Sequence, residues 1–268
     1  MPVYQPRIVG EWPSDLRVDV VIPVLNEAHV LARSVATVQQ FLATAPSCRW
    51  RVVIVDNGST DGTEAVARDL AAAHSDVQFI QLPLRGRGRA LRQAWTQSDA
   101  DIMCYTDVDL STELAALPRM VQAIAVDGFD LATGSRLLPG SRTRRSASRE
   151  FISRCYNLFV KAVLWTSFSD AQCGFKAISR QAMLDLVPSV RDQSWFFDTE
   201  LLVLAEKGGY RIADLPVEWI EDDDSRVRIV RTAWDDIKGV WRVRWALWRA
   251  AVSPRSAPSR QLSKRSSP

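Results

Sequence analysis

Short apolar runs rich in valine and isoleucine alternate with stretches long enough to form helices along the first part of the chain. The runs are Val18–Pro23, Arg49–Val55, Val77–Leu82 and Ile102–Tyr105. Because a helix can separate each strand from the next, the strands can lie parallel in one sheet. The spacing predicts an α/β fold, with a mostly parallel, doubly wound sheet flanked by helices.

Polar residues follow three of these strands at the point where each strand ends. They are Asn26-Glu27, the segment Asp56 to Asp61, and the pair Asp107 and Asp109. In doubly wound sheets, ligands bind outside the carboxyl ends of the strands. A helix cap explains one such cluster readily, but three clusters at one edge indicate a binding site.

The two aspartates that end the fourth strand are candidate metal ligands. Alternation along the strand places Asp107 and Asp109 on one side and turns Val108 toward the protein. Adjacent carboxylates repel each other unless a cation lies between them, and hard oxygen ligands suit Mg²⁺ or Mn²⁺. We therefore predict a Mg²⁺ or Mn²⁺ site at Asp107 and Asp109. The alternative is that Asp109 or Thr112 only caps a helix over residues 113–126.

A basic, glycine-rich segment, Arg85-Gly-Arg-Gly-Arg89, follows the third strand and precedes a helix. Its glycines allow close approach, and its arginines and helix start suit a diphosphate. The first strand is not followed by Gly-x-Gly-x-x-Gly, and the sequence has no Walker lysine loop. Dinucleotide and ATP sites of those types are therefore disfavoured.

Charge and cysteine content narrow the possible partners and the compartment. The net charge is +3, and residues 253–268 contain four basic residues and no acid. The remainder is near neutral, so we expect no nucleic-acid partner. Four scattered cysteines without zinc-like spacing suit a reducing cytosol. No signal peptide is visible, and the longest apolar span, 156–168, is short and interrupted by Lys161, so we expect no bilayer crossing.

These motifs resemble the family 2 inverting glycosyltransferases of the GT-A fold. In the first half, the matching segments are Pro23-Val-Leu-Asn-Glu27, Val55–Thr63, Arg85–Ala90 and Asp107-Val-Asp-Leu-Ser111. The second half is similar to the dolichol- and polyprenyl-phosphate sugar synthases, through Gly134-Ser-Arg136, Asp170–Lys176, Phe197-Asp-Thr-Glu200, Pro216-Val-Glu-Trp219 and Ser225-Arg-Val227. The segments occur in the expected order from about Val18 to Gly239.

The resemblance implies a nucleotide-sugar donor, a divalent metal and a polyprenyl monophosphate acceptor. The Asp-Val-Asp-Leu-Ser form is closer to glucose synthases than to mannose synthases, which carry Gln where Ser111 stands. UDP-glucose is thus favoured as donor, with GDP-mannose as the alternative. The resemblance implies donor contacts for Pro23, Val24, Asn26, Glu27, Asp56, Asn57, Arg85, Gly86, Arg89, Asp107, Val108 and Asp109.

The same resemblance implies an acceptor side and a reacting centre. Acceptor contacts are expected from Arg136, Arg149, Gln172, Lys176 and Arg226. Catalytic roles are expected for Asp107, Asp109, Arg136 and Asp198. Ordinary alternatives exist for some of these residues: Asp198 and Glu200 as partners of a helix dipole, and Lys176 as a lysine at a strand edge.

Six arginines and one acid lie between Arg136 and Arg154. Arginine binds phosphates bidentately, which indicates an acceptor-phosphate or membrane-facing surface. For Arg142, Arg144 and Arg145, a solvated basic loop is the alternative.

Neither of the two histidines falls in a cluster. A phosphate acceptor needs no base, because most such phosphates are dianionic at pH 7.

The C-terminal region has a different pattern. Trp234, Trp241, Trp245 and Trp248 recur at helical spacing among basic residues. Tryptophan favours membrane interfaces, so the stripe predicts either an interfacial helix or core packing. We expect a flexible arm over 1–16, a single GT-A domain over 17–230, an amphipathic helix over 231–252, and a disordered basic tail over 253–268.

Together these patterns predict an inverting glycosyltransferase that acts on polyprenyl phosphate, in the cytoplasm and peripherally associated with the membrane. One alternative is a transferase for a soluble hydroxyl acceptor, in which Asp198 would act as base. Another is a catalytically silent protein that binds nucleotide sugars.

Overall fold

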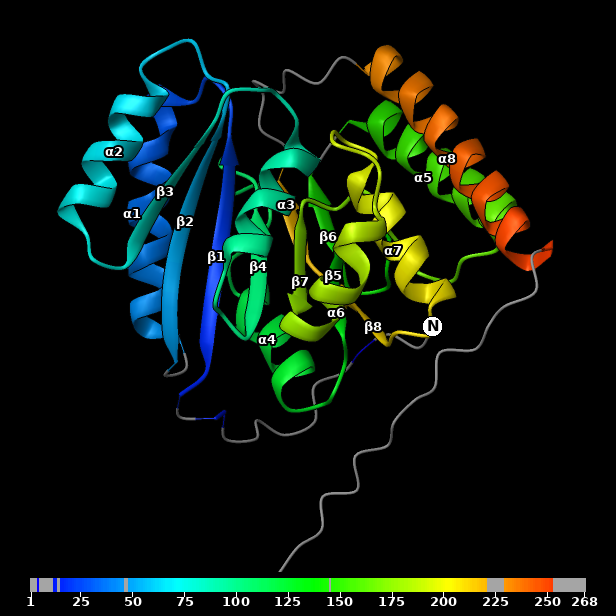
Figure 1. Cartoon of the computed structure of the whole chain (residues 1–268), viewed down its shortest axis with the longest axis horizontal. Helices are drawn as coiled ribbons and strands as arrows, with labels where there is room; N and C mark the ends of the chain where they lie inside the picture. Colours follow the sequence, from blue (N-terminus) through cyan, green and yellow to red (C-terminus); the bar gives the residue numbers. More distant parts are fainter. Residues whose placement is uncertain are drawn as a thin grey trace, which may run out of the picture.

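A central seven-stranded sheet has the order β3-β2-β1-β4-β7-β5-β8 (Figure 1). The computed structural model describes residues 4, 12–13, 15–45, 48–144, 146–220 and 229–252. The strands of the sheet are β1 (Arg17–Val24), β2 (Arg49–Asn57), β3 (Val77–Leu82), β4 (Ile102–Thr106), β5 (Leu131–Ser135), β7 (Phe175–Ser179) and β8 (Ile212–Pro216). Only β7 runs antiparallel to its neighbours in this sheet. The predicted α/β fold with a mostly parallel sheet is confirmed.

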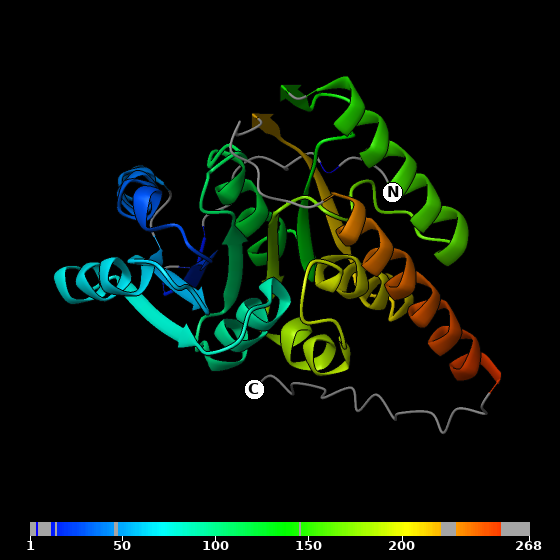
Figure 2. The same ribbon diagram turned by 90° about the horizontal axis from the view of Figure 1, so that it is seen from above.

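Helices cover both faces of the sheet (Figures 1 and 2). They are α1 (Ala28–Thr44), α2 (Thr63–Ala73), α3 (Arg87–Gln97), α4 (Ala116–Ala125), α5 (Ala147–Leu164), α6 (Arg180–Leu186), α7 (Phe197–Lys207) and α8 (Ile229–Val252), with a 3₁₀ turn at Val187–Ser189. A small second sheet pairs β6 (Arg142–Arg144) with β9 (Glu218–Ile220).

Each face of the sheet has its own apolar core. Alternate residues of β4 enter different cores: Cys104 packs with the core that includes α1, α2 and α4, whereas Tyr105 packs with the core that includes α3, α5, α6 and α7. Apolar burial on both faces explains why the strands read as continuous hydrophobic runs rather than alternating ones.

Helix α8 packs on α5 and α7 with one face and exposes the other. Its inward face carries Gly239, Val240 and Val243, which are buried. Its four tryptophans, Trp234, Trp241, Trp245 and Trp248, lie on the opposite face and are 51–60% exposed. The tryptophan stripe is therefore not the packed side of this helix.

The residues before β1 that the structure describes contact the domain. Tyr4 is buried against Phe129, and the indole of Trp12 donates to Gln122 (2.7 Å). The rest of the expected arm and the expected tail over 253–268 lie outside the described residues. Within the described residues, no helix combines the length and apolar character needed to cross a bilayer.

The helix after the aspartate pair begins later than the sequence suggests. Its first residue is Ala116, and Ala115 precedes it without a side-chain cap. Thr112 instead forms an isolated bridge with Trp219. Neither Asp109 nor Thr112 caps the helix, so a capping role does not account for the aspartate pair.

Candidate active site

The loops after β1, β2 and β3 meet at the carboxyl edge of the sheet through hydrogen bonds. The amide of Asn57 donates to the carbonyl of Val24 (2.7 Å), and the N–H of Gly86 donates to Asn57 Oδ1 (2.9 Å). The N–H of Asn26 donates to Ser59 Oγ (2.8 Å). The predicted donor residues from three separate loops are therefore brought together.

The remaining predicted donor residues of these loops lie at the same edge. Pro23 is half-buried in β1, and the N–H of Glu27 donates to Thr63 Oγ1 (2.8 Å). Arg85 is exposed, while Arg89 is half-buried in the first turn of α3. Arg85 thus offers a charge to a ligand outside the sheet edge.

Gly86 has a structural reason to be glycine. Its φ of +146° lies in a region that other residues rarely adopt, and an added Cβ would lie 2.3 Å from the carbonyl oxygen of Gln193. Any side chain here would separate the loop after β3 from the segment that precedes α7. The residue thus holds the donor loop against the second half of the molecule.

Asp56 ends β2 and is almost fully buried, with 1% of its surface exposed. Its Oδ1 accepts a hydrogen bond from the N–H of Ser59 (3.0 Å). Its Oδ2 has no hydrogen-bond partner among the residues that the structure describes. A buried carboxylate oxygen left unpaired is costly, so this atom marks a position for a donor group on a ligand.

The aspartate pair has the alternation predicted for it. Val108 is buried, whereas Asp107 is half-buried and Asp109 is exposed. Asp109 Oδ1 accepts from the N–H of Ser111 (3.0 Å), and Asp107 Oδ1 lies 2.7 Å from Arg87 Nη2. Burial raises the pKa of Asp107 to about 6, although the Arg87 guanidinium opposes the shift.

Arg87 and Lys176 surround a second carboxylate, Asp198. The Tyr105 hydroxyl donates to Asp198 Oδ1 (2.5 Å), Lys176 Nζ lies 3.7 Å from the same atom, and Arg87 Nη1 lies 3.9 Å from Oδ2. Lys176 also donates to the carbonyl of Cys173 (2.6 Å) and is buried. Asp198 is therefore held in place by a hydroxyl and two cations.

Arg87 is the site residue that the sequence reasoning missed. Its guanidinium is 10% exposed and lies over the rings of Tyr105 and Trp195. The Arg85–Arg89 segment as a whole was the signal, and the structure shows that Arg87 begins α3 and faces the aspartates, whereas Arg85 faces solvent. An added Cβ on Gly174 would lie 1.8 Å from Asp107 Oδ2, so the wall opposite must be glycine.

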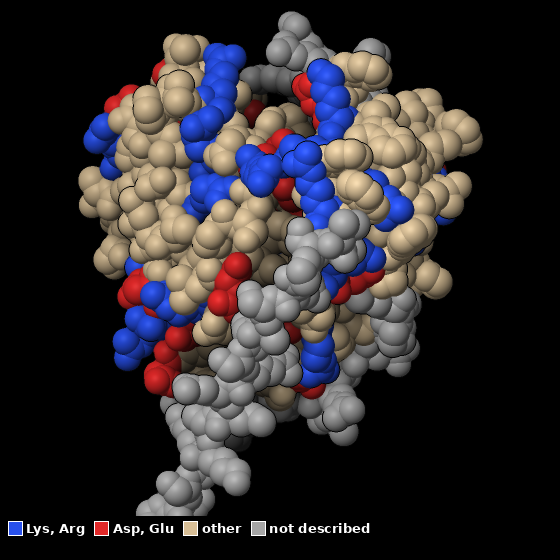
Figure 3. All heavy atoms as spheres, turned by 45° about the vertical axis from the view of Figure 1, so that its right-hand side comes forward, with Lys and Arg blue, Asp and Glu red and all other residues tan. Residues whose placement is uncertain are grey.

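Arg136 follows β5 and is fixed by a buried partner. Its Nε and Nη2 bind both carboxylate oxygens of Asp170 (2.7 and 3.0 Å), and its guanidinium lies over the ring of Trp219. Burial alone would raise the pKa of Asp170, but Arg136 lowers it to about 2. The bidentate pair fixes the orientation of the arginine. Figure 3 shows Lys and Arg side chains close to Asp and Glu side chains on one side of the molecule.

The other predicted acceptor residues are placed differently. Gln172 donates to Asp236 Oδ2 of α8 (2.6 Å), so it links the 170–174 turn to that helix. Arg149 is half-buried in the first turn of α5. Arg226 lies outside the described residues. Lys176 is buried next to Asp198, away from the surface.

The carboxylate oxygens at this edge suit a divalent cation. Asp107 and Asp109 offer hard oxygen atoms at the open edge of the sheet, and Mg²⁺ typically takes one or two carboxylates together with phosphate oxygens and water. Among the described residues, no three His, Cys, Asp or Glu side chains cluster to form a complete protein cage. The pair therefore fits an ion that a ligand diphosphate helps to hold.

Comparison with known proteins agrees with this arrangement. The sequence profile of Glycosyl transferase family 2 matches residues 19–187. The chain belongs to this family.

Curated relatives match almost the whole chain. Glycosyltransferase AglD of Haloferax volcanii is 36% identical over 93% of the chain, which spans 40% of the length of that relative. Dolichyl-phosphate beta-glucosyltransferases of Trichomonas vaginalis (ALG5C) and Saccharomyces cerevisiae are 27% and 28% identical, over 88% and 84% of the chain and 74% and 72% of their own lengths.

Solved structures share the fold. Glucosyl-3-phosphoglycerate synthase from Mycobacterium tuberculosis in complex with UDP superposes with a TM-score of 0.66, at 20% identity, over 95% of this chain and 90% of that one. The same enzyme with Mn²⁺, UDP and glucosyl-3-phosphoglycerate gives a TM-score of 0.60 at 20% identity, over 90% and 82%. The GT-A fold implied by the motifs is confirmed.

Proposed function

We propose that this protein transfers glucose from UDP-glucose to a polyprenyl or dolichyl monophosphate, with inversion at the anomeric carbon, at the cytoplasmic face of a membrane. The relatives named dolichyl-phosphate beta-glucosyltransferases support this substrate class. UDP-glucose carries its sugar in the α configuration, so a β product requires inversion.

The observation that carries the proposal is that the Asp198 carboxylate is already bound by neighbouring side chains. A hydroxyl acceptor needs a base, but Asp198 already binds Tyr105 and lies close to Lys176 and Arg87. A phosphate monoester is mostly dianionic at pH 7 and needs no deprotonation. The site therefore suits a phosphate nucleophile better than the soluble hydroxyl of the alternative prediction.

The residues divide into a donor side and an acceptor side. Asp56 Oδ2 would accept from the nucleobase, and Asp107 and Asp109 would hold Mg²⁺ or Mn²⁺ with the diphosphate. When bound, such an ion neutralises the charge of a diphosphate leaving group. Arg87 adds fixed positive charge at the same carboxylates, and Arg136 would bind the acceptor phosphate bidentately. Catalysis then rests on positioning and charge stabilisation.

The tryptophan face of α8 would carry the protein to the bilayer. Four exposed tryptophans in one row, with Lys238, Arg244 and Arg249 at its borders, match the preferences of a membrane interface. The guanidinium of Arg249 lies over the ring of Trp245, which keeps the basic groups beside the aromatic row. The protein would then be a peripheral membrane enzyme.

A donor and acceptor screen tests the proposed function. Purified protein with Mg²⁺ or Mn²⁺ is offered radiolabelled UDP-glucose, GDP-mannose or UDP-N-acetylhexosamine with a polyprenyl phosphate or with a soluble sugar. We expect organic-extractable label from UDP-glucose and polyprenyl phosphate alone. Label that appears only in the soluble product would contradict the proposal, as would release of free glucose with no transfer.

A further inference from the structure

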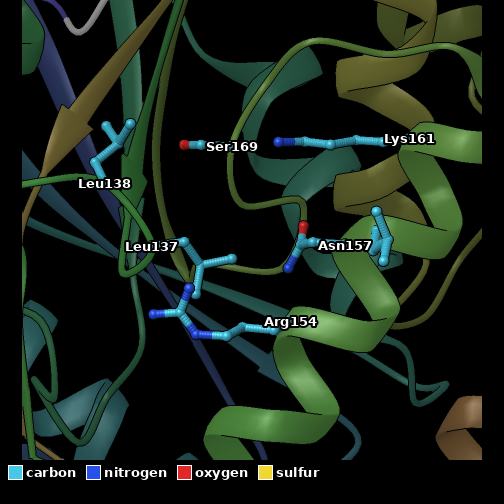
Figure 4. Close-up of a pocket in the computed structure, with 7 residues that line it drawn as sticks. Leu137, Leu138, Arg154, Asn157, Lys161 and Ser169 are labelled. Atoms are coloured by element: carbon cyan, nitrogen blue, oxygen red, sulfur yellow. The ribbon is translucent and has the colours of Figure 1, made fainter.

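A groove lies between α5 and the segment that follows β5. Its volume is about 310 Å³, at the lower end of the range of roughly 300–1,000 Å³ found for small-molecule sites. Figure 4 shows the side chains that line it: Leu137, Leu138, Arg154, Asn157, Leu158, Lys161 and Ser169. None of them is among the predicted donor or acceptor contacts, although Arg154 belongs to the arginine-rich segment 136–154 described above.

The lining combines apolar walls with basic side chains. Leu137 and Leu138 form one wall and Leu158 contributes to the other, while Arg154 and Lys161 extend from α5 toward the 137–138 segment (Figure 4). None of the described residues that line the groove is acidic. Long basic side chains can pack their stems along an apolar chain and keep their charges in water. The groove therefore fits an apolar chain with an anionic end.

Both basic groups can respond to such a ligand. Arg154 pairs with Glu150 one helical turn away (2.6 Å), in an ion pair of the solvent-exposed kind that contributes little stability. Lys161 has no ion-pair partner within the described part of the chain. A phosphate near α5 would thus compete with a weak interaction at Arg154 and with none at Lys161.

The inner end of the groove adjoins the Arg136–Asp170 pair. Leu137 directly follows Arg136, and Ser169 directly precedes Asp170. The hydroxyl of Ser169 donates to Ser135 Oγ (2.7 Å), and the N–H of Leu137 donates to the same oxygen (3.2 Å). The 137–138 segment and the segment of Ser169 are therefore joined next to Arg136.

The outer end opens on an exposed apolar surface. Leu158 of α5 is 68% exposed, and Phe151 on the same helix and Trp165, which directly follows it, are each 69% exposed. Arg244 of α8 lies over the ring of Trp165, 4.3 Å from its centroid, so this surface adjoins the helix that carries the tryptophan row. An apolar chain that leaves a membrane at this surface would enter the groove past Leu158.

We propose that the groove binds the isoprenoid chain of the acceptor next to its phosphate, and that it delivers the phosphate to Arg136. This inference rests on the proposed function. The three leucines contact the isoprenoid units, and Arg154 and Lys161 place positive charge along the path of the phosphate to Arg136. The groove thus selects an isoprenoid phosphate over a free phosphate or a soluble sugar phosphate.

Photocrosslinking tests the inference without requiring turnover. A diazirine-bearing farnesyl phosphate in detergent micelles is irradiated with the purified protein, and the labelled peptides are mapped by mass spectrometry. We expect label on residues 137–138 or 154–161, which unlabelled farnesyl phosphate removes and inorganic phosphate does not. Label confined to the tryptophans of α8, or label that inorganic phosphate removes equally, would overturn the proposal.

Kinetics of a matched pair of variants gives the second test. Leu158→Ser, at an exposed position, should raise the KM for a long-chain polyprenyl phosphate about tenfold, because it removes an apolar contact. The KM for UDP-glucose and the melting temperature should stay unchanged. The control is Leu184→Ser on α6, which is also exposed and should change nothing. An unchanged KM for polyprenyl phosphate in Leu158→Ser would contradict isoprenoid binding in the groove. Absence of transfer by the wild type would instead refute the proposed function, and crosslinking alone would then decide whether the groove binds an isoprenoid chain.

Discussion

At the carboxyl edge of the sheet, the two halves hold their polar residues in different ways. In the half formed by β1 to β3, loop side chains bind backbone groups of neighbouring loops, as Asn57 does with Val24 and Gly86. In the other half, side chains bind each other as buried ion pairs, such as Arg136 with Asp170. Bonds between side chains and loop backbone shape a surface for a ligand, whereas buried ion pairs fix the position of single charged groups.

This difference separates the two proposed substrates. A nucleotide sugar offers many hydrogen-bonding groups, which backbone-tethered loops can surround. A lipid phosphate offers a compact charge and an apolar chain, which a fixed guanidinium and an apolar groove can recognise. Helix α8 belongs to the acceptor half, since Arg242 binds Glu200 of α7 (2.8 and 2.9 Å) and Asp236 accepts from Gln172.

The largest expected effect comes from removing a carboxylate on the donor side. Asp107→Asn and Asp109→Asn should each lower kcat by ~100-fold or more, on the scale of one lost group that stabilises transition-state charge. A chelator should abolish wild-type activity, and added Mg²⁺ or Mn²⁺ should restore it. Glu64→Gln, which changes an exposed carboxylate that binds Arg68 and Gln81 away from the site, serves as the control. Full activity in chelator would refute the metal site.

The next effect should distinguish the acceptor half from the donor half. Arg136→Ala should raise the KM for polyprenyl phosphate by roughly ten- to a hundredfold, because a charge-assisted contact contributes about 1.5–3 kcal/mol. The KM for UDP-glucose should not change. Measuring both constants decides whether the two halves bind separate substrates.

Asp170 complicates this variant, because it is fully buried and would lose its partner. An uncompensated buried charge costs about 3–5 kcal/mol of stability. The double variant Arg136→Ala/Asp170→Ala should therefore recover much of the melting temperature without recovering the acceptor KM. Recovery of both would show that Arg136 has only a structural role.

A smaller effect should separate the two faces of α8. Trp241→Ser/Trp245→Ser/Trp248→Ser should reduce binding to anionic liposomes at every salt concentration with little loss of stability, since exposed substitutions typically change it by about 0.5 kcal/mol or less each. Val240→Ser on the buried face should instead lower the melting temperature. Unfolding of the triple variant would contradict an exposed tryptophan face.

Deleting residues 253–268 should affect liposome binding in a salt-dependent way, unlike the tryptophan replacements. Each of its four basic residues can contribute about 1 kcal/mol near an anionic surface. This attraction is screened as the Debye length shrinks to ~3 Å at 1 M salt. Liposome flotation should therefore show weaker binding of the truncated protein at low salt only. A deficit that persists at 1 M salt would indicate a contribution other than charge.

The smallest effect concerns the buried contact between α8 and the 170–174 turn. Burial raises the pKa of Asp236 to about 7 from its ordinary value of 3.8, against the hydrogen bond from Gln172. An acid with a raised pKa in the folded state destabilises the fold as pH rises from about 4 to about 7. Asp236→Asn should therefore gain melting temperature over the wild type between pH 5 and pH 8. If the melting temperatures of Asp236→Asn and the wild type differ by the same amount at every pH, Asp236 does not titrate in this range.

Much of the donor side was predictable because its signals are local. A buried parallel strand must end at the sheet edge, so the polar residues that follow Val24, Val55 and Thr106 had to lie there. The placement of Asp56, Asp107 and Asp109 needed no knowledge of distant partners. Arg87 escaped prediction because a turn of backbone, which spacing does not reveal, decides which of three neighbouring arginines faces inward.

The acceptor side depended on contacts between residues far apart in the sequence. Nothing local to Arg136 indicates Asp170 as its partner, and nothing local to Lys176 indicates burial beside Asp198. In α8 the tryptophan stripe has a helical period that fits either a core or a surface. The chain also carries a second stripe with Gly239, Val240 and Val243, and Phe196 lies so close to Gly239 that an added Cβ would be 2.5 Å from its ring. The sequence by itself determined the sheet and its donor edge, because strand ends are local features. Tertiary packing alone decided which face of α8 is buried. Both stripes have the same period, and only the shape of α7 and its preceding loop selects between them.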